Sequence, residues 1–152
     1  MTGPRDTPQV LVHADMSLAL AQRLLQGVRD AAAAEGLSIA GAVVDRGGQI
    51  VAVARIDGTP ICGVPIAIDK AFSAVALEAP TDAWAHSTTP GGPDWGMSTA
   101  LGGRMAVYPG GLPLFHDGEL VGGLGVSGAE GHQDKECALA SIRAARLTDS
   151  AG

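Results

Sequence analysis

Two cations, Lys70 and Arg104, are the first residues whose type and setting could support chemistry. Lys70 lies in an alanine-rich segment, and Arg104 directly follows the pair Gly102-Gly103 in an almost uncharged stretch. A planar guanidinium can hold a carboxylate through two parallel hydrogen bonds, and the N–H groups of neighbouring glycines can add to such an anion site. The two cations therefore predict a site for a carboxylate or a propionate.

A structural interpretation of the same two residues stays open. Arg104 could pair with Asp69 or Asp45, and Lys70 could extend its ammonium group to water. Both interpretations agree with the residue types and with their spacing.

The four histidines supply candidates for proton transfer. No two of them stand three or four residues apart, so the sequence lacks a helical pair of metal ligands. His86 lies in the approach to a glycine pair, where an imidazole could act as general acid or base near neutral pH. His116 precedes a hairpin turn and is the second candidate for that role. A solvent-exposed histidine is the alternative at each position.

Aromatic residues are scarce, and Trp95 is the one that we expect to face a pocket. It stands beside Asp94 in the glycine-rich stretch, and an aromatic wall suits a flat ligand. The predicted ligand-binding residues are Lys70, Gly91, Gly92, Trp95, Gly102, Gly103 and Arg104.

Around these residues the sequence predicts five strands. Asp117-Gly118 is typical of a two-residue hairpin turn between two apolar runs, and Arg46-Gly47-Gly48 separates two β-branched runs in the same way. A fifth apolar run follows Arg104 and has the length of a strand. The predicted strands are Leu37–Asp45, Gln49–Ile56, Met105–Tyr108, Leu112–His116 and Glu119–Ser127.

Helices are predicted before, between and after these strands. Apolar residues at helical spacing follow Ser17 until Gly36, and Pro80 ends an alanine-rich helix. The other predicted helices are Ile66–Leu77, a short turn at Asp82–His86, and His132–Arg146. This order gives an α+β fold with a mostly antiparallel, five-stranded sheet flanked by helices. Residues 1–15 form a loose arm, whose apolar patch at Val10–Val12 could dock on a neighbour, and residues 16–150 form a single domain.

Composition excludes several classes of function. The chain has 152 residues and a formal net charge of −6, and it contains no basic run, so we expect no nucleic-acid partner. The amino terminus lacks a secretory signal, and no apolar run reaches the length of a membrane span, so we expect a cytoplasmic protein without a membrane partner.

The motifs together resemble the GlcG/HbpS-like family, which also occurs as the carboxy-terminal domain of PduO-type proteins. The resemblance rests on PGGP…GGR, GGLPL, DGELVGGLGVSG and the helix that contains Asp134, and upstream on VVDRGGQIVAVARIDG and IDKAFSAVALEAPT. It covers roughly Leu18 to Leu147.

The resemblance implies a profilin-like fold and a homo-oligomer. Similar proteins are assigned haem binding, corrinoid-associated roles or no activity. Some of them place an axial histidine where this chain has His13, so His13 is the candidate ligand of a haem iron. His86 and the surroundings of Trp95 differ from the pattern of the family, which could mean a changed ligand.

Two functions remain open. In the first, the chain binds haem or a similar anionic, flat small molecule in a pocket at the glycine-rich stretch. In the alternative, it is a small cofactor-independent lyase or isomerase, in which Arg104 holds a substrate carboxylate and His86 or His116 moves a proton.

Overall fold

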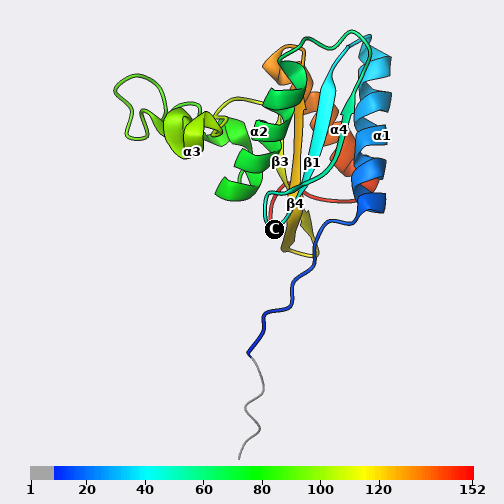
Figure 1. The fold of residues 1–152 in the computed structure, drawn as a ribbon, viewed down its shortest axis with the longest axis horizontal. Coiled ribbons are helices and arrows are strands. Elements are labelled where there is room, and N and C mark those ends of the chain that lie inside the picture. The colour runs from blue at the N-terminus through cyan, green and yellow to red at the C-terminus, as the bar shows by residue number, and fades with distance from the viewer. Residues whose placement is uncertain (1–8) are drawn as a thin grey trace, which may run out of the picture.

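The computed structural model describes residues 9–152. Four strands form one antiparallel sheet in the order β2-β1-β4-β3, and helices lie on both of its faces (Figure 1). The strands are β1 (Ala40–Asp45), β2 (Ile50–Arg55), β3 (Gly111–His116) and β4 (Glu119–Ser127). The helices are α1 (Leu18–Glu35), α2 (Gly63–Leu77), the short α3 (Ala100–Gly103) and α4 (Gly131–Ala145), with two 3-10 turns, η1 (Thr81–Trp84) and η2 (Met97–Thr99).

Local signals in the sequence place most of these elements. The side chain of Ser17 accepts a hydrogen bond from the N–H of Leu20 at the start of α1, and Gly36 ends the helix with a left-handed backbone. Both predicted hairpins are confirmed, because β1 pairs with β2 and β3 pairs with β4, each pair antiparallel. The α+β class is therefore confirmed.

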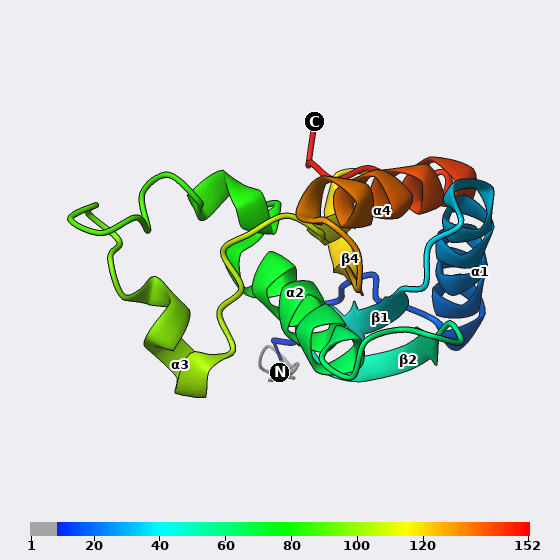
Figure 2. The same ribbon diagram turned by 90° about the horizontal axis from the view of Figure 1, so that it is seen from above.

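Two apolar cores separate the layers. Helices α1 and α4 pack on one face of the sheet, and α2 packs on the other (Figure 2). The first core is built on Leu24, Val28, Leu124 and Ile142, and the second on alanines of α2 against Ala42 and Val44 of β1. Strands β1, β3 and β4 therefore bury both of their faces, which explains why β1 and β4 read as continuous apolar runs, whereas β2 stays partly exposed.

Helix α2 lies unusually close to the sheet. A Cβ added at Gly125 would collide with the carbonyl oxygen of Ala67, and one at Gly123 would lie 2.5 Å from the carbonyl oxygen of Ala71. Backbone therefore meets backbone at these positions, and only glycine leaves the room for this approach. Gly123 and Gly125 of β4 thus provide the tight contact between the sheet and α2.

The predicted strand at Met105–Tyr108 is wrong, and the sheet that residues 9–152 form has four strands instead of five. Side chains, and not a neighbouring strand, bind the backbone of this segment. Ser73 Oγ accepts a hydrogen bond from Ala106 N at 2.8 Å, and Thr81 Oγ1 donates to the carbonyl oxygen of Tyr108. Met105 and Ala106 are buried, so their apolar character reflects packing and not strand pairing.

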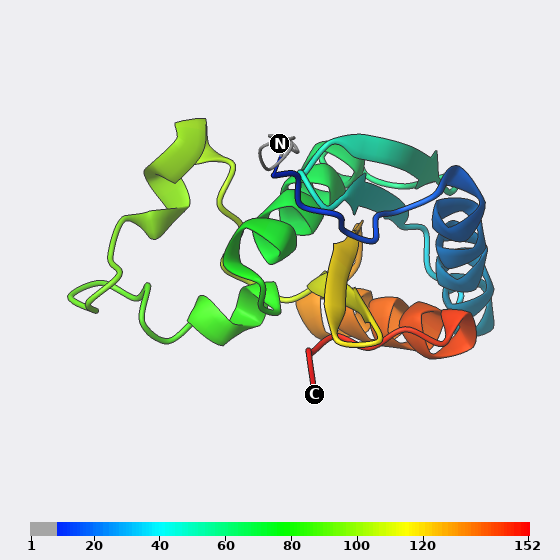
Figure 3. The same cartoon turned by 90° about the horizontal axis from the view of Figure 1, so that it is seen from below.

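Residues 85–104, which we call the excursion, project from the side of the molecule beyond α2 (Figures 2 and 3). The excursion contains η2 and α3, and its backbone has positive φ at Gly91, Gly96, Gly102 and Gly103. The glycine-rich stretch therefore divides into an exposed part before Arg104 and a buried part that forms β3 and β4.

The predicted arm, residues 1–15, begins outside the described residues. Its described part, residues 9–15, contains neither helix nor strand and runs away from the body (Figure 1). Within residues 9–152, every helix is too short or too polar to cross a bilayer.

We predict that Gly125→Ala destabilises the fold because the added methyl group would collide with the backbone of α2. Overpacking of this kind costs about 1–3 kcal/mol or more, so the urea midpoint should fall clearly. Gly47→Ala is the matched control, since Gly47 is exposed and an added Cβ would lie 3.4 Å from Asp45 Oδ1. Equal stability of the two variants would contradict the close approach of α2.

Candidate functional site

Lys70 lies fully inside the protein, with 2% of its side chain exposed. Its Nζ donates to Asp134 Oδ2 at 3.0 Å and to the carbonyl oxygen of Val126 at 2.8 Å, and it lies 5.3 Å from the centre of the Tyr108 ring. Asp134 in turn accepts a hydrogen bond from Ala129 N at 3.1 Å. The ammonium group is therefore satisfied within the chain and does not reach water.

Burial acts on both members of this pair. It lowers the pKa of Lys70 from 10.5, and the charge of Asp134 opposes that change. Burial raises the pKa of Asp134 from 3.8, against the opposing charge of Lys70. Desolvation is the larger effect on each group, so each charge depends on the presence of the other.

Arg104 pairs with Asp69, which is one of the two partners that the structural interpretation of the sequence offered. Its Nε lies 3.3 Å from Asp69 Oδ1, and its guanidinium lies 3.8 Å from the centre of the Phe72 ring. Its side chain is 41% exposed and that of Asp69 is 35% exposed. One edge of the guanidinium therefore remains open to solvent on the outer side of α2, although a carboxylate already contacts it.

Tyr108 lies near both the buried Lys70 and the partly exposed Asp69. Its ring contacts Lys70 from one side. Burial raises the pKa of its hydroxyl above 10.0, and the charges of Asp69 and Cys62 add to this effect. Asp69, Arg104 and Tyr108 thus gather on the outer side of α2, at the base of the excursion, whereas Lys70 points inward.

The other predicted ligand-binding residues lie on the excursion. Trp95 is 64% exposed, and Gly91, Gly102 and Gly103 have left-handed backbones with open space around them. Gly92 is needed for the loop itself, since a Cβ there would collide with the carbonyl oxygen of Ser87. His86 is exposed, and its carbonyl oxygen accepts a hydrogen bond from Thr89 Oγ1 at 2.9 Å.

His13 and His116 lie elsewhere. Ala14 N donates to Glu119 Oε2 at 3.4 Å, so His13 stands at the end of the sheet where β3 turns into β4. His116 lies at the same turn, with its Nδ1 3.6 Å from Asp117 Oδ2. Lys70 contacts Val126, which is seven residues further along β4, or roughly 20 Å at the usual rise of a strand. His13 and Lys70 therefore do not share a site within one chain.

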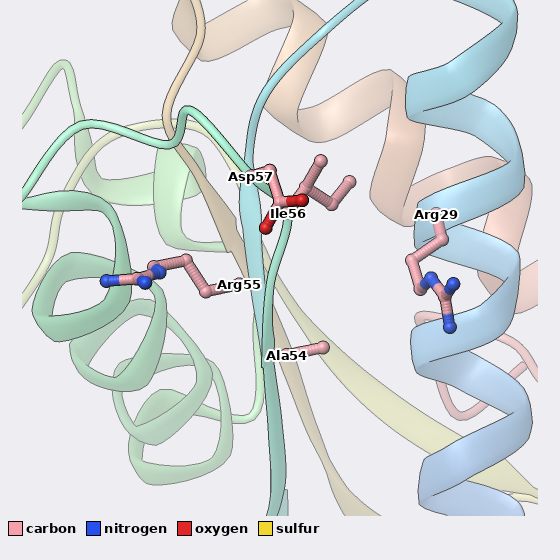
Figure 4. Close-up of a pocket in the computed structure, with 5 residues that line it drawn as sticks. All are labelled: Arg29, Ala54, Arg55, Ile56 and Asp57. Carbon is pink, nitrogen blue, oxygen red and sulfur yellow. The ribbon is translucent and has the colours of Figure 1, made fainter.

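Hollows of the surface are found at both ends of the sheet. One, of about 330 Å³, includes Phe115, His116 and Arg146. Another, of about 390 Å³, lies beside β2 and is lined by Arg29, Ala54, Arg55, Ile56 and Asp57. Figure 4 shows Ala54 and Ile56 pointing toward α1, where Arg29 lies, while Arg55 points away from them. These two arginines therefore do not converge on one ligand.

Sequence reasoning missed the partner of Lys70. Asp134 is 64 residues away, and only the arrangement of α2, β4 and α4 brings it close. The one available signal is physical, since a lysine among alanines in a helix against the sheet needs a carboxylate if it is buried. Phe72, on which Arg104 lies, was also missed.

Comparisons with known proteins agree with one another. Residues 16–143 match the family model described as "Haem degrading protein HbpS-like". A 15.0 kDa protein from the dhaT-dhaS intergenic region of Citrobacter freundii is 30% identical over 80% of this chain and 86% of its own length. The corrinoid adenosyltransferase PduO of Salmonella typhimurium is 32% identical over 67% of this chain, which spans 30% of PduO.

Solved structures show the same fold. The Klebsiella pneumoniae protein ORFY is 27% identical and superposes with a TM-score of 0.87, covering 95% of this chain and 98% of ORFY. PduOC, solved as a complex with haem, is 26% identical with a TM-score of 0.86, covering 90% of this chain and 99% of PduOC.

We predict that Lys70→Met destabilises the protein by about 3–5 kcal/mol, because Asp134 would remain buried without its partner. The double variant Lys70→Met/Asp134→Leu should lose less than Lys70→Met alone, as measured by urea unfolding. Lys135→Met is the control: it breaks the partly exposed pair with Asp82, for which we expect about 1 kcal/mol or less. A double variant less stable than Lys70→Met would contradict this account.

We predict that Tyr108 titrates above pH 10.0, which absorbance at 295 nm can follow because the chain has a single tyrosine. Asp69→Asn should move the midpoint down without restoring it fully, since burial is the larger cause. With its folded pKa raised, Tyr108 contributes its stability below pH 10.0 and loses it as the pH rises through the folded pKa. Asp30→Asn on α1 should leave the midpoint unchanged, and a midpoint at or below 10.0 would contradict the placement of Tyr108.

Proposed function

Because the chain belongs to the HbpS-like family, we propose that it binds haem or a similarly flat, anionic small molecule. The observation that carries this proposal is the likeness to PduOC, which was solved with haem and matches this chain over nearly its whole length. The description of the family as haem-degrading points to the same class of ligand.

His13 is the residue that we propose as the protein ligand of a haem iron. A haem iron needs only one protein ligand, and haem supplies redox chemistry at that iron when it is bound. His13 is exposed, and its imidazole makes no hydrogen bond or ion pair with the rest of residues 9–152. Groups of three or more metal-ligating side chains are absent from the same described residues, so a single axial ligand suits this chain better than a bare metal ion.

The excursion offers the second set of contacts. Trp95 presents an exposed aromatic face, and the open edge of Arg104 could bind a propionate or another carboxylate. Gly91, Gly92, Gly102 and Gly103 supply the turns that carry these side chains. Lys70 would help to position the residues around it and would not contact the ligand, since its ammonium group is already bound by Asp134.

We also propose that the protein is a homo-oligomer. Trp95 and Leu101 are 64% and 62% exposed on a segment that projects from the body, and a large exposed apolar side chain is typical of a contact surface. The enzyme alternative, a lyase or isomerase, stays a prediction from the sequence. His86 lies on the excursion, and His116 lies at the turn between β3 and β4.

Titration of the purified protein with haemin tests the proposal. We expect a saturable shift of the Soret band, which His13→Ala abolishes and His132→Ala, another exposed histidine, leaves intact. If the excursion contacts a propionate, Arg104→Ala should weaken binding roughly tenfold or more, since a charge-assisted hydrogen bond contributes about 1.5–3 kcal/mol. The absence of a saturable shift, or equal effects of the two histidine variants, would count against haem at His13.

A further inference from the structure

One edge of the sheet is open. Strand β2 is the last strand on its side, and within residues 9–152 its ladder partner is β1 alone. Ile50 is 55% exposed and Val53 is 38% exposed on this strand, so apolar side chains flank the free backbone groups. An open edge of this kind can pair with another extended segment.

The opposite edge is partly covered. Phe115 N on β3 donates to the carbonyl oxygen of Thr148 at 2.8 Å, and Thr148 N donates to the carbonyl oxygen of Phe115 at 3.1 Å. The chain after α4 thus pairs with β3 through its own backbone at Phe115. Of the two edges that the described residues form, β2 is the more open one for a new strand.

The amino-terminal arm carries exposed apolar residues that could pair with such an edge. Val10, Leu11 and Val12 are 74%, 86% and 88% exposed, which is rare for three consecutive large apolar residues in a lone chain. The arm leaves the body as an extended trace (Figure 1). Val10 and Val12 are β-branched, and such residues favour strand pairing.

The base of the arm is fixed to its own chain. Asp15 Oδ1 accepts a hydrogen bond from Arg46 N at 2.8 Å, and Ala14 N donates to Glu119 Oε2 at 3.4 Å. With these bonds in place, residues 9–13 run away from the body and not along their own β2 (Figure 1). We propose that residues 9–13 of one copy pair with the edge of β2 in a second copy of this chain.

The surface beside β2 suits such a segment. The hollow that contains Ala54 and Ile56 shares Arg29 and Ile56 with a second one, of about 270 Å³, which is lined also by Ala33 and Leu37. Side chains alternate across a strand, so an added strand would direct every second side chain toward α1 and this groove, where Ala54, Ile56 and Leu37 offer apolar contacts beside charged residues such as Arg29. Two copies related by a two-fold axis can exchange arms, which closes the assembly.

Cross-linking between two differently tagged chains tests the exchange. One chain carries Leu11→Cys, and the other carries Val53→Cys or Ile50→Cys. Both carry Cys62→Ser, which removes the exposed native thiol and leaves the buried Cys137. The matched control replaces the second chain with Arg143→Cys, an exposed position on α4. After mild oxidation, non-reducing gels and mass spectrometry identify the linked pairs.

We expect a disulfide between the two chains at Val53 or Ile50 in excess over the Arg143 control, and a smaller native mass when residues 2–12 are removed. A link at neither β2 position, or links no more frequent than in the control, overturns the proposal. A single chain that carries both Leu11→Cys and Val53→Cys serves as a further test. If it forms the disulfide only within itself, the proposal is overturned, because the arm would then pair with β2 of its own chain. These readouts need no haem, so they fail or succeed independently of the proposed ligand.

Discussion

The structure depends on the close approach of α2 to the sheet. Gly123 and Gly125 of β4, and Gly111 of β3, let the backbone of α2 lie directly on the strands, where a Cβ would meet carbonyl oxygens. Contacts at this distance exclude water and allow little rearrangement, since packed interiors deform at a large cost. The same approach explains the buried ion pair. A Cβ at Gly110 would lie 2.6 Å from Lys70 Nζ, so glycine also provides the space that the ammonium group occupies.

The fixed position of α2 makes its outer face a defined support for the excursion. Ser73 and Thr81 bind the backbone at both ends of the segment that returns from the excursion, through Ala106 N and the carbonyl oxygen of Tyr108. Arg104 is then held between Asp69 and Phe72. A side chain that is ordered by packing and by hydrogen bonds loses less entropy when a ligand binds. The partly exposed guanidinium is therefore better prepared for a carboxylate than a free surface arginine.

Sequence reasoning succeeded where the information is local. Asp117-Gly118 and Arg46-Gly47-Gly48 are turn signals that lie beside the strands they connect, and both hairpins follow them. It failed at Met105–Tyr108, because the length and apolar character of a run do not reveal whether its backbone will pair with a strand or with the side chains of Ser73 and Thr81. The partner of Lys70 was out of reach for a related reason, since Asp134 comes close only once α2, β4 and α4 are assembled.

Arm exchange and ligand binding would be coupled if both occur, because His13 belongs to the segment that docks. A histidine on a chain without helix or strand is a poor axial ligand by itself, since ordering each residue of backbone costs about 1–2 kcal/mol. The hydrogen bonds of Ala14 and Asp15 fix only the residues that follow His13. Pairing of residues 9–13 with a second copy would fix the residues before it as well, so less of this entropy would remain to be lost on binding. Linkage then requires the reverse effect, so that a ligand held by His13 strengthens the association of the two copies.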